Sequence, residues 1–470
     1  MFRLRPVGKL AAKSAAEISH SRLGIGFEKL DRGVFEPERA YEKLAAIGVK
    51  WVRIQSGWQR TERQPGVYDF AWLDSIVDNL ISRGLKPWIC LCYGNGLYDE
   101  FAATIFGAVG CPPIHTEEQR IAWKNYVTAL VERYKDRVMY YEIWNEPDGQ
   151  YCWKHGVNPE EVGKFNEDTG KYIKSVYPEA QVIGGCVCRR VASFINEAFD
   201  KSNMAEYIDA ISFHEYTHDE TTVPERVEML HAIADKYKPG IRIIQGESGS
   251  QSRTGGAGAV RNLFWSEKAQ AKQCARHTMI DLMSDIEFTS FFTTVDMIEA
   301  LRGKVDDKAS YLDYGYFGVL GAQFDEDGFS TGEYIPKPSY YTLQTIASVF
   351  VGDALPKKAP VIFRPEFCPG TQLNDLKRTE VISGYFERED GSSAFVYWKP
   401  DNIITTDYNG TVTFEIVGNA EETMLIDLVS GEIYEIPGSQ IENLKSGCRL
   451  FKHIPVKETP LALCIGNFYR

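Results

Sequence analysis

Residues 139–149 read MYYEIWNEPDG, and the fold of the chain can be worked out from this stretch. Its first six residues, 139–144, form a nearly continuous apolar run with the length of a strand that is buried on both faces. Asn145 and Glu146 follow directly, where such a strand would become a loop. The stretch therefore predicts a strand of a parallel sheet with polar side chains at its carboxyl end.

Seven further runs of the same kind occur on either side, separated by longer amphipathic stretches. The expected strands are 24–30, 51–55, 87–93, 139–144, 181–187, 208–213, 241–246 and 288–295. The expected helices are 37–47, 70–83, 117–134, 159–176, 193–199, 224–237, 266–283 and 339–350. Eight alternating pairs predict an α/β fold, a (β/α)8 barrel over residues 21–350, with its functional side chains at the carboxyl ends of the strands.

The pattern changes after residue 350 to short alternating runs with turn signals such as DGSS and SGE. We expect residues 351–470 to form a C-terminal antiparallel β-sandwich without a catalytic cluster of its own. Residues 1–20 are an N-terminal extension that could add an edge strand to this sandwich.

Composition excludes several classes of protein. The chain has 470 residues, of which 44% are hydrophobic and 25% charged, values that exclude disorder. A net charge of −13 repels phosphate backbones and anionic lipid, so we expect no nucleic-acid and no membrane partner. No apolar run is long enough to span a membrane, and the ten scattered cysteines are typical of a cytoplasmic protein. Nothing in the sequence indicates the oligomeric state.

A second carboxylate occupies the position equivalent to that of Glu146. Residues 241–250 read IRIIQGESGS and place Glu247 at the end of the seventh strand, about three βα units after Glu146. Both carboxylates are therefore expected at the same mouth of the barrel. Two carboxyl groups that face each other across a cleft are what glycoside hydrolysis requires.

The tracts YYEIWNEPDG and IIQGESG resemble those of retaining (β/α)8 glycoside hydrolases, which carry their acid/base and nucleophile glutamates on strands four and seven. A sandwich after the barrel and a KPSYYTLQ helix after strand eight make the chain most similar to the β-xylosidase/α-L-iduronidase family, glycoside hydrolase family 39. The resemblance covers about residues 24–350 well and the remainder only in outline.

The resemblance implies roles for individual residues. Glu146 matches the general acid/base and Glu247 the nucleophile. Asn145 matches the amide that binds the sugar 2-hydroxyl, and Arg53 the arginine that supports the nucleophile.

Three further positions are candidates for binding substrate. His214 and Tyr216 match a His-x-Tyr pair near the nucleophile. Where relatives often place a tryptophan at the end of strand eight, this chain reads SFFTTVDMIEA, and Asp296 is the expected polar contact.

Aromatic side chains at the barrel mouth are expected to stack on sugar rings. Among those that follow strand ends, Trp58 and Trp153 are the first candidates.

Together these features predict a retaining glycoside hydrolase that cleaves β-glycosidic bonds by double displacement through a covalent glycosyl-enzyme, a β-xylosidase-like or related exo-glycosidase. The alternatives are a noncatalytic carbohydrate-binding barrel and a transglycosylase, which shares the covalent intermediate. We expect no cofactor and no metal. Residues 214–218 formally match HExxH, but that zinc motif requires a helix, and the residues before it are strand-like.

Overall fold

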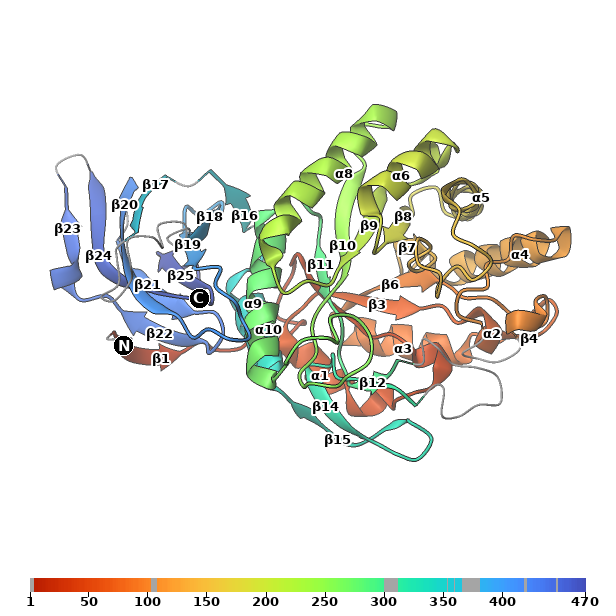
Figure 1. Ribbon diagram of the computed structural model, residues 1–470, viewed down its shortest axis with the longest axis horizontal. Coiled ribbons are helices and arrows are strands. Elements are labelled where there is room, and N and C mark those ends of the chain that lie inside the picture. Colours follow the sequence, from red (N-terminus) through yellow and green to blue (C-terminus); the bar gives the residue numbers. More distant parts are fainter. Residues whose placement is uncertain are drawn as a thin grey trace.

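A computed structural model describes residues 4–102, 108–299, 312–352, 354–358, 360–365, 381–417, 421–444 and 447–470. The molecule has two parts, a barrel and a β-sandwich, which lie side by side along its longest axis (Figure 1).

Eight parallel strands close into a barrel, which confirms the predicted (β/α)8 fold. Around the barrel they run β2 (Leu23–Gly26), β3 (Trp51–Gln55), β6 (Lys86–Leu91), β7 (Tyr140–Ile143), β8 (Gln181–Val187), β9 (Ala210–Glu215), β10 (Arg242–Ser248) and β11 (Thr289–Phe291). Nearly every residue of these strands is buried, because the barrel interior covers one face and the helices cover the other.

The principal helices follow the strands in the expected order. They are α1 (Tyr41–Ile47), α3 (Ala71–Ser82), α4 (Glu117–Tyr134), α5 (Pro159–Val176), α6 (Val191–Asp200), α8 (Val223–Tyr237), α9 (Glu267–Met283) and α10 (Pro338–Val349). Their starts carry clear signals: Thr116 forms a capping box with Gln119 before α4, and Ser266 accepts a hydrogen bond from Ala269 N at the start of α9.

The first and last strands are shorter than predicted. β2 ends at Gly26, and Lys29, with φ 63°, turns the chain into a short 3-10 helix at Leu30–Arg32. β11 ends at Phe291, and the chain then forms two small antiparallel pairs before α10, namely β12 (Met297–Ile298) with β13 (Tyr314–Gly315) and β14 (Leu320–Phe324) with β15 (Ser330–Pro336). Apolar residues continue past the end of each strand, so the sequence pattern predicted both strands to end later than they do.

The C-terminal part is built from two antiparallel sheets. The seven-stranded sheet has the order β1 (Arg5–Lys9), β22 (Glu432–Glu435), β21 (Thr423–Asp427), β25 (Leu461–Ile465), β19 (Ser393–Trp398), β18 (Ile382–Glu387) and β16 (Leu355–Lys357). The four-stranded sheet has the order β17 (Val361–Pro365), β20 (Asn409–Val417), β24 (Cys448–Lys457) and β23 (Ile441–Asn443). Side chains from both sheets, such as Phe395 and Phe414, share one core, as in a β-sandwich. The N-terminal strand β1 lies at the edge of the larger sheet, antiparallel to β22.

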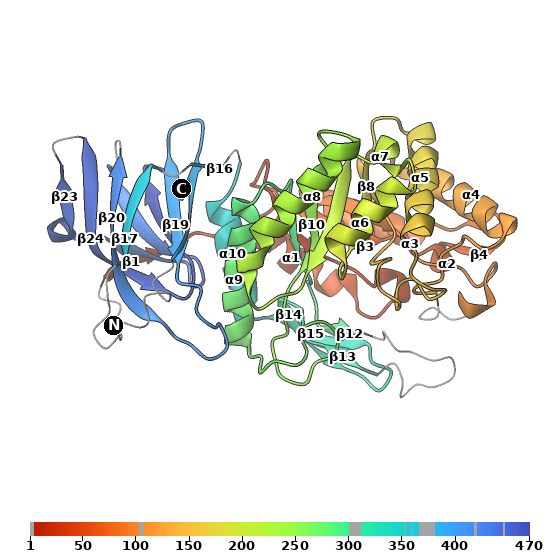
Figure 2. The ribbon, with the colours of Figure 1, turned by 45° about the horizontal axis from the view of Figure 1, so that its top comes forward.

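Helices α9 and α10 lie between the barrel and the sandwich (Figure 2). Buried polar contacts join the two parts: Glu220 of the barrel accepts hydrogen bonds from Trp398 Nε1 of the sandwich at 2.9 Å and from Arg276 Nε of α9 at 2.7 Å. Within the described ranges, no helix combines the length and the apolar character needed to cross a membrane.

Candidate active site

Six of the predicted site residues meet at the carboxyl ends of the barrel strands. They are Arg53 on β3, Asn145 and Glu146 directly after β7, His214 on β9, Tyr216 directly after β9, and Glu247 on β10. They come from four strands of the barrel and the adjoining loops, so only closure of the barrel brings them together.

Arg53 is fully buried and lies at the centre of this group. Its Nε donates to Glu142 Oε2 at 2.6 Å, and its Nη2 donates to Asn145 Oδ1 at 2.9 Å. Its Nη1 donates to Glu247 Oε1 and lies 3.1 Å from Glu28 Oε1. Such a planar fork holds several carboxyl groups in fixed positions while neutralising part of their charge.

Glu247 is buried but is held in its charged form. Burial alone would raise its pKa, yet the charges of His214 and Arg53 outweigh this effect and hold the pKa of Glu247 below its ordinary value. Tyr216 Oη donates to Glu247 Oε2 at 2.5 Å, while burial and the Glu247 charge keep the pKa of Tyr216 well above 10. The tyrosine therefore remains a hydrogen-bond donor to an ionised carboxylate.

Glu146 is aimed into the barrel mouth by an unusual turn. Trp144 and Glu146 have φ values of 66° and 48°, in the left-handed region that non-glycine residues seldom adopt. The turn is held by Glu146 N, which donates to Cys186 O at 2.9 Å. Strain of this kind is typical of sites where one side chain must point in one direction.

His214 lies close to the carboxylates of both Glu146 and Glu247. Its Nδ1 lies 2.9 Å from Glu146 Oε1 and 3.6 Å from Glu247 Oε2. Burial would lower the pKa of His214, but the two carboxylates more than compensate and raise it above its ordinary value. A protonated imidazole here lowers the repulsion between the two acids.

The two carboxylates are close together. One ligand-type atom of each of Glu146, His214 and Glu247 lies within 4.8 Å of the others, so a carboxylate oxygen of Glu146 lies within that distance of one of Glu247. Both carboxylates line a cavity of about 110 Å³. Aromatic and apolar side chains complete its wall, among them Tyr93, Tyr151, Phe292 and Phe317.

Glu28 is a third acid in this cavity that the sequence did not indicate. It follows β2 by two residues, but the predicted strand 24–30 placed it inside a strand rather than beyond its end. Had the strand been ended at Gly26, the rule that side chains just past barrel strands are functional would have selected it. Burial, together with the nearby charge of Glu247, raises the pKa of Glu28 to about 8.

The structure corrects the prediction that Trp58 and Trp153 face the substrate. Their exposed fractions are 1% and 0%, and neither lines the cavity among the described residues. Trp58 lies between Tyr98 and Tyr126, with ring centroids 5.5 Å from each, and its Nε1 donates to Glu62. Both tryptophans belong to the aromatic core under the loops, because large rings lower the free energy most when they are fully buried.

The prediction for Asp296 is likewise wrong in position. Asp296 is buried behind the cavity, where its Oδ1 lies 2.6 Å from Lys337 Nζ and accepts a hydrogen bond from Gly318 N at 2.9 Å. It does not line the cavity. Its carboxylate instead stabilises the segment between β11 and α10, through Lys337 and Gly318.

Two groups at the barrel mouth have the composition of metal sites, namely Glu142, Cys186 and His214, and Glu146, His214 and Glu247. Arg53 already supplies the positive charge for both groups, since it contacts Glu142 and Glu247 directly. The HExxH match does not form a zinc motif, because His214 and Glu215 lie on strand β9 rather than on a helix.

Comparison with known proteins agrees with this geometry. Residues 38–241 match the family model described as glycosyl hydrolases family 39. A β-xylosidase of Geobacillus stearothermophilus is 29% identical over 156 residues, which cover 32% of this chain and 31% of that protein. A β-xylosidase of Caldicellulosiruptor saccharolyticus is 28% identical over 190 residues, covering 37% and 38%. The matches thus span about a third of the length of these relatives.

The fold is shared over a longer range. The structure of a family 39 glycoside hydrolase from the gut symbiont Bacteroides cellulosilyticus WH2 superposes with a TM-score of 0.65, covering 95% of this chain and 81% of that one at 19% identity. The barrel and the sandwich therefore occur together in that protein as well.

Proposed function

Because residues 38–241 match the model of glycosyl hydrolases family 39, we propose that this chain is a member of that family and hydrolyses β-glycosidic bonds with retention of anomeric configuration. The observation that carries the proposal is the pair Glu146 and Glu247, with carboxylate oxygens within 4.8 Å of each other. Retaining enzymes hold their carboxyl groups about 5–5.5 Å apart, whereas inverting enzymes need about 6.5–9.5 Å to admit a water.

In the first step Glu247 attacks the anomeric carbon of the sugar. A bond forms between a Glu247 oxygen and this carbon while the glycosidic bond breaks, and the leaving oxygen takes a proton from Glu146. Arg53 and Tyr216 keep Glu247 ionised and oriented for the attack. Arg53 also fixes the Asn145 amide, so that its nitrogen is available for the sugar 2-hydroxyl.

In the second step a water molecule displaces the Glu247 carboxylate from the sugar. Glycosylation removes the negative charge of Glu247, so Glu146, now ionised, accepts a proton from the incoming water. The water oxygen bonds to the anomeric carbon and the bond to Glu247 breaks. Tyr216 stabilises the carboxylate that is released.

The size of the cavity favours an exo-acting enzyme. A volume of about 110 Å³ is well below the roughly 300–1,000 Å³ of pockets for larger ligands, which supports binding of a single terminal sugar residue. A second hollow of about 590 Å³ lies next to it, and Arg32 lines both. We assign the leaving group to this second hollow and, following the relatives, a β-xyloside to the first.

Catalysis is favoured over noncatalytic binding. A binding barrel does not require two acids this close to one buried histidine, because like charges at this distance raise the free energy of the fold. Transglycosylation would use the same two carboxylates, and products formed with excess sugar acceptor distinguish it from hydrolysis.

A cytoplasmic location stays a prediction. It is supported by the nine cysteines that the structure describes, which form no disulfides with one another.

The test is hydrolysis of a panel of aryl β-glycosides, with the configuration of the first-formed product followed by NMR. We expect β-product from a β-xyloside and loss of activity by about 10³-fold or more in Glu247→Gln. Glu215→Gln is the matched control, because Glu215 is buried on β9 but pairs with Arg226 at 2.8 Å outside the cavity. An α-product, or full activity in Glu247→Gln, would overturn the proposal.

A further inference from the structure

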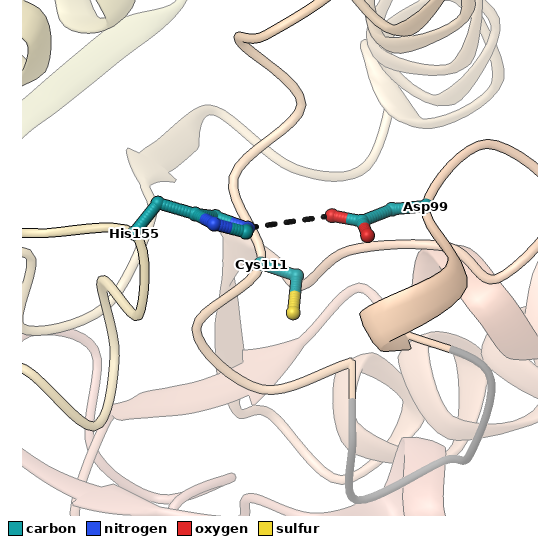
Figure 3. A group of neighbouring side chains, drawn as sticks. All are labelled: Asp99, Cys111 and His155. Atoms are coloured by element: carbon teal, nitrogen blue, oxygen red, sulfur yellow. Dashed lines mark ion pairs between the residues drawn. The ribbon is translucent and has the colours of Figure 1, made fainter.

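Two loops above the barrel bring a carboxylate, a thiol and an imidazole together. Asp99 and Cys111 belong to the segment between β6 and α4, and His155 belongs to the segment between β7 and α5. In Figure 3 the Asp99 carboxylate and the His155 ring face each other, and Cys111 lies beside the line that joins them. The mechanism proposed above uses none of these three side chains.

The spacing of the three groups fits a metal ion better than direct contacts. His155 Nε2 and Asp99 Oδ2 are 3.6 Å apart, close enough for an ion pair when the imidazole is protonated (Figure 3) but too far for a hydrogen bond. Two ligands bound about 2.0–2.2 Å from one tetrahedral zinc ion are roughly 3.3–3.6 Å apart. One ligand atom from each of the three residues lies within 4.8 Å of the other two, so small movements of the side chains close the site.

Asp99 has an oxygen that needs a partner. Its Oδ1 accepts a hydrogen bond from Phe101 N at 2.9 Å. Its Oδ2 is buried and has no hydrogen-bond partner in the described structure, although only 10% of the side chain is exposed. A buried carboxylate oxygen without a donor raises the free energy of the fold, and a cation between Asp99 and His155 would remove that cost.

The backbone holds the two loops together at this point. Lys154 N donates to Gly110 O at 2.8 Å, and these residues precede His155 and Cys111. Gly110 has φ +81°, and a Cβ there would lie 2.3 Å from Tyr151 O, so the close approach of the loops requires glycine. Ligands from both loops are therefore positioned before any ion binds.

We propose that Asp99, Cys111 and His155 bind a Zn²⁺ ion that fastens these two loops to each other. Carboxylate, thiolate and imidazole are all zinc ligands, and the thiol releases its proton to solvent when the metal binds. A quarter of the His155 side chain is exposed, so water can reach this residue and supply a fourth ligand.

The site would also fix one wall of the cavity. Val109 and Lys154 line the cavity and lie within two residues of Cys111 and His155, respectively. The ion acts on the loops alone, so the proposal stands whether or not the barrel hydrolyses glycosides.

The test uses the full chain freed of metal by a chelator and then titrated with Zn²⁺ or Co²⁺. We expect one equivalent of zinc per chain by elemental analysis, a higher Tm with zinc, and a thiolate-to-metal charge-transfer band with Co²⁺. His155→Gln should weaken zinc binding at least about 100-fold, and Cys111→Ser should remove the cobalt band.

Three variants serve as controls. His231→Gln removes a histidine that lies 3.5 Å from a carboxylate oxygen of Asp285, and Cys188→Ser removes a half-buried thiol beside Asp148. Glu247→Gln alters one of the two acid and histidine clusters at the barrel mouth. All three should bind zinc like the unmodified chain. Less than a tenth of an equivalent of zinc, a cobalt complex without the thiolate band, or equal loss of metal in His231→Gln or Glu247→Gln would overturn the proposal.

Discussion

Glu28→Gln should make the folded protein more stable, and increasingly so as pH rises. Glu28 lies 3.1 Å from Arg53 and is only 2% exposed. The pKa of its carboxyl is raised from 4.5 to about 8, first by burial and then by the charge of Glu247. The folded chain therefore keeps this proton at pH values at which the unfolded chain has lost it.

The size of the effect follows from linkage between protonation and folding. A shift of 3.5 pKa units corresponds to about 5 kcal/mol, since each unit is worth 1.36 kcal/mol. Because the folded-state pKa is raised, the free energy of unfolding decreases as pH rises above about 4.5. The full contribution of about 5 kcal/mol is lost above about pH 8. The amide of Glu28→Gln cannot ionise, so the stability of this variant does not decrease with pH for this reason. Its advantage should grow from near zero at pH 4.5 to about 5 kcal/mol at pH 8.5.

The assay is denaturant unfolding of both proteins at several pH values between 4.5 and 8.5. Glu62→Gln is the matched control, since Glu62 is equally buried but accepts hydrogen bonds from Trp58, Tyr98 and Gly66 N. An amide there loses acceptors and should destabilise the fold. If the free-energy difference between Glu28→Gln and the unmodified chain is the same at every pH, Glu28 is ionised in the folded state and the reasoning is wrong.

Three further substitutions test the site. Tyr216→Phe removes a charge-assisted hydrogen bond to Glu247 worth about 1.5–3 kcal/mol, so kcat should fall about 10–150-fold while Tm changes little. Asp296→Asn leaves the buried Lys337 without its counter-charge and should cost about 3–5 kcal/mol of stability, measured by unfolding, whereas a role in substrate binding would raise KM instead. Trp58→Phe should lower Tm and leave KM within about twofold, because the ring is packed in the core. A rise in KM without a change in Tm would show instead that Trp58 contacts the substrate.

Periodicity was sufficient to predict the barrel, because strands buried on both faces alternate with amphipathic helices along the whole of its length. The excursions after β11 were not predicted. Strands of two residues, such as β12 (Met297–Ile298), are too short to give a periodic signal.

The site could be predicted where position relative to a strand end is informative, as for Glu146 and Glu247. The site could not be predicted where packing in the core determines which way a side chain points. Trp153 and Asp296 also follow strand ends, yet packing and an ion pair with Lys337 turn them away from the cavity. Glu28 was missed for the opposite reason, since the apolar pattern continued past the end of β2.

The most direct test of the central claim is to trap the covalent intermediate. The chain is incubated with an activated 2-deoxy-2-fluoro β-xyloside, whose fluorine slows release of the sugar, and its peptides are then weighed by mass spectrometry. Our account predicts one fluoro-sugar per chain, attached to the peptide that contains Glu247. Turnover of the reagent without an adduct, or a label on a different carboxylate, would contradict it.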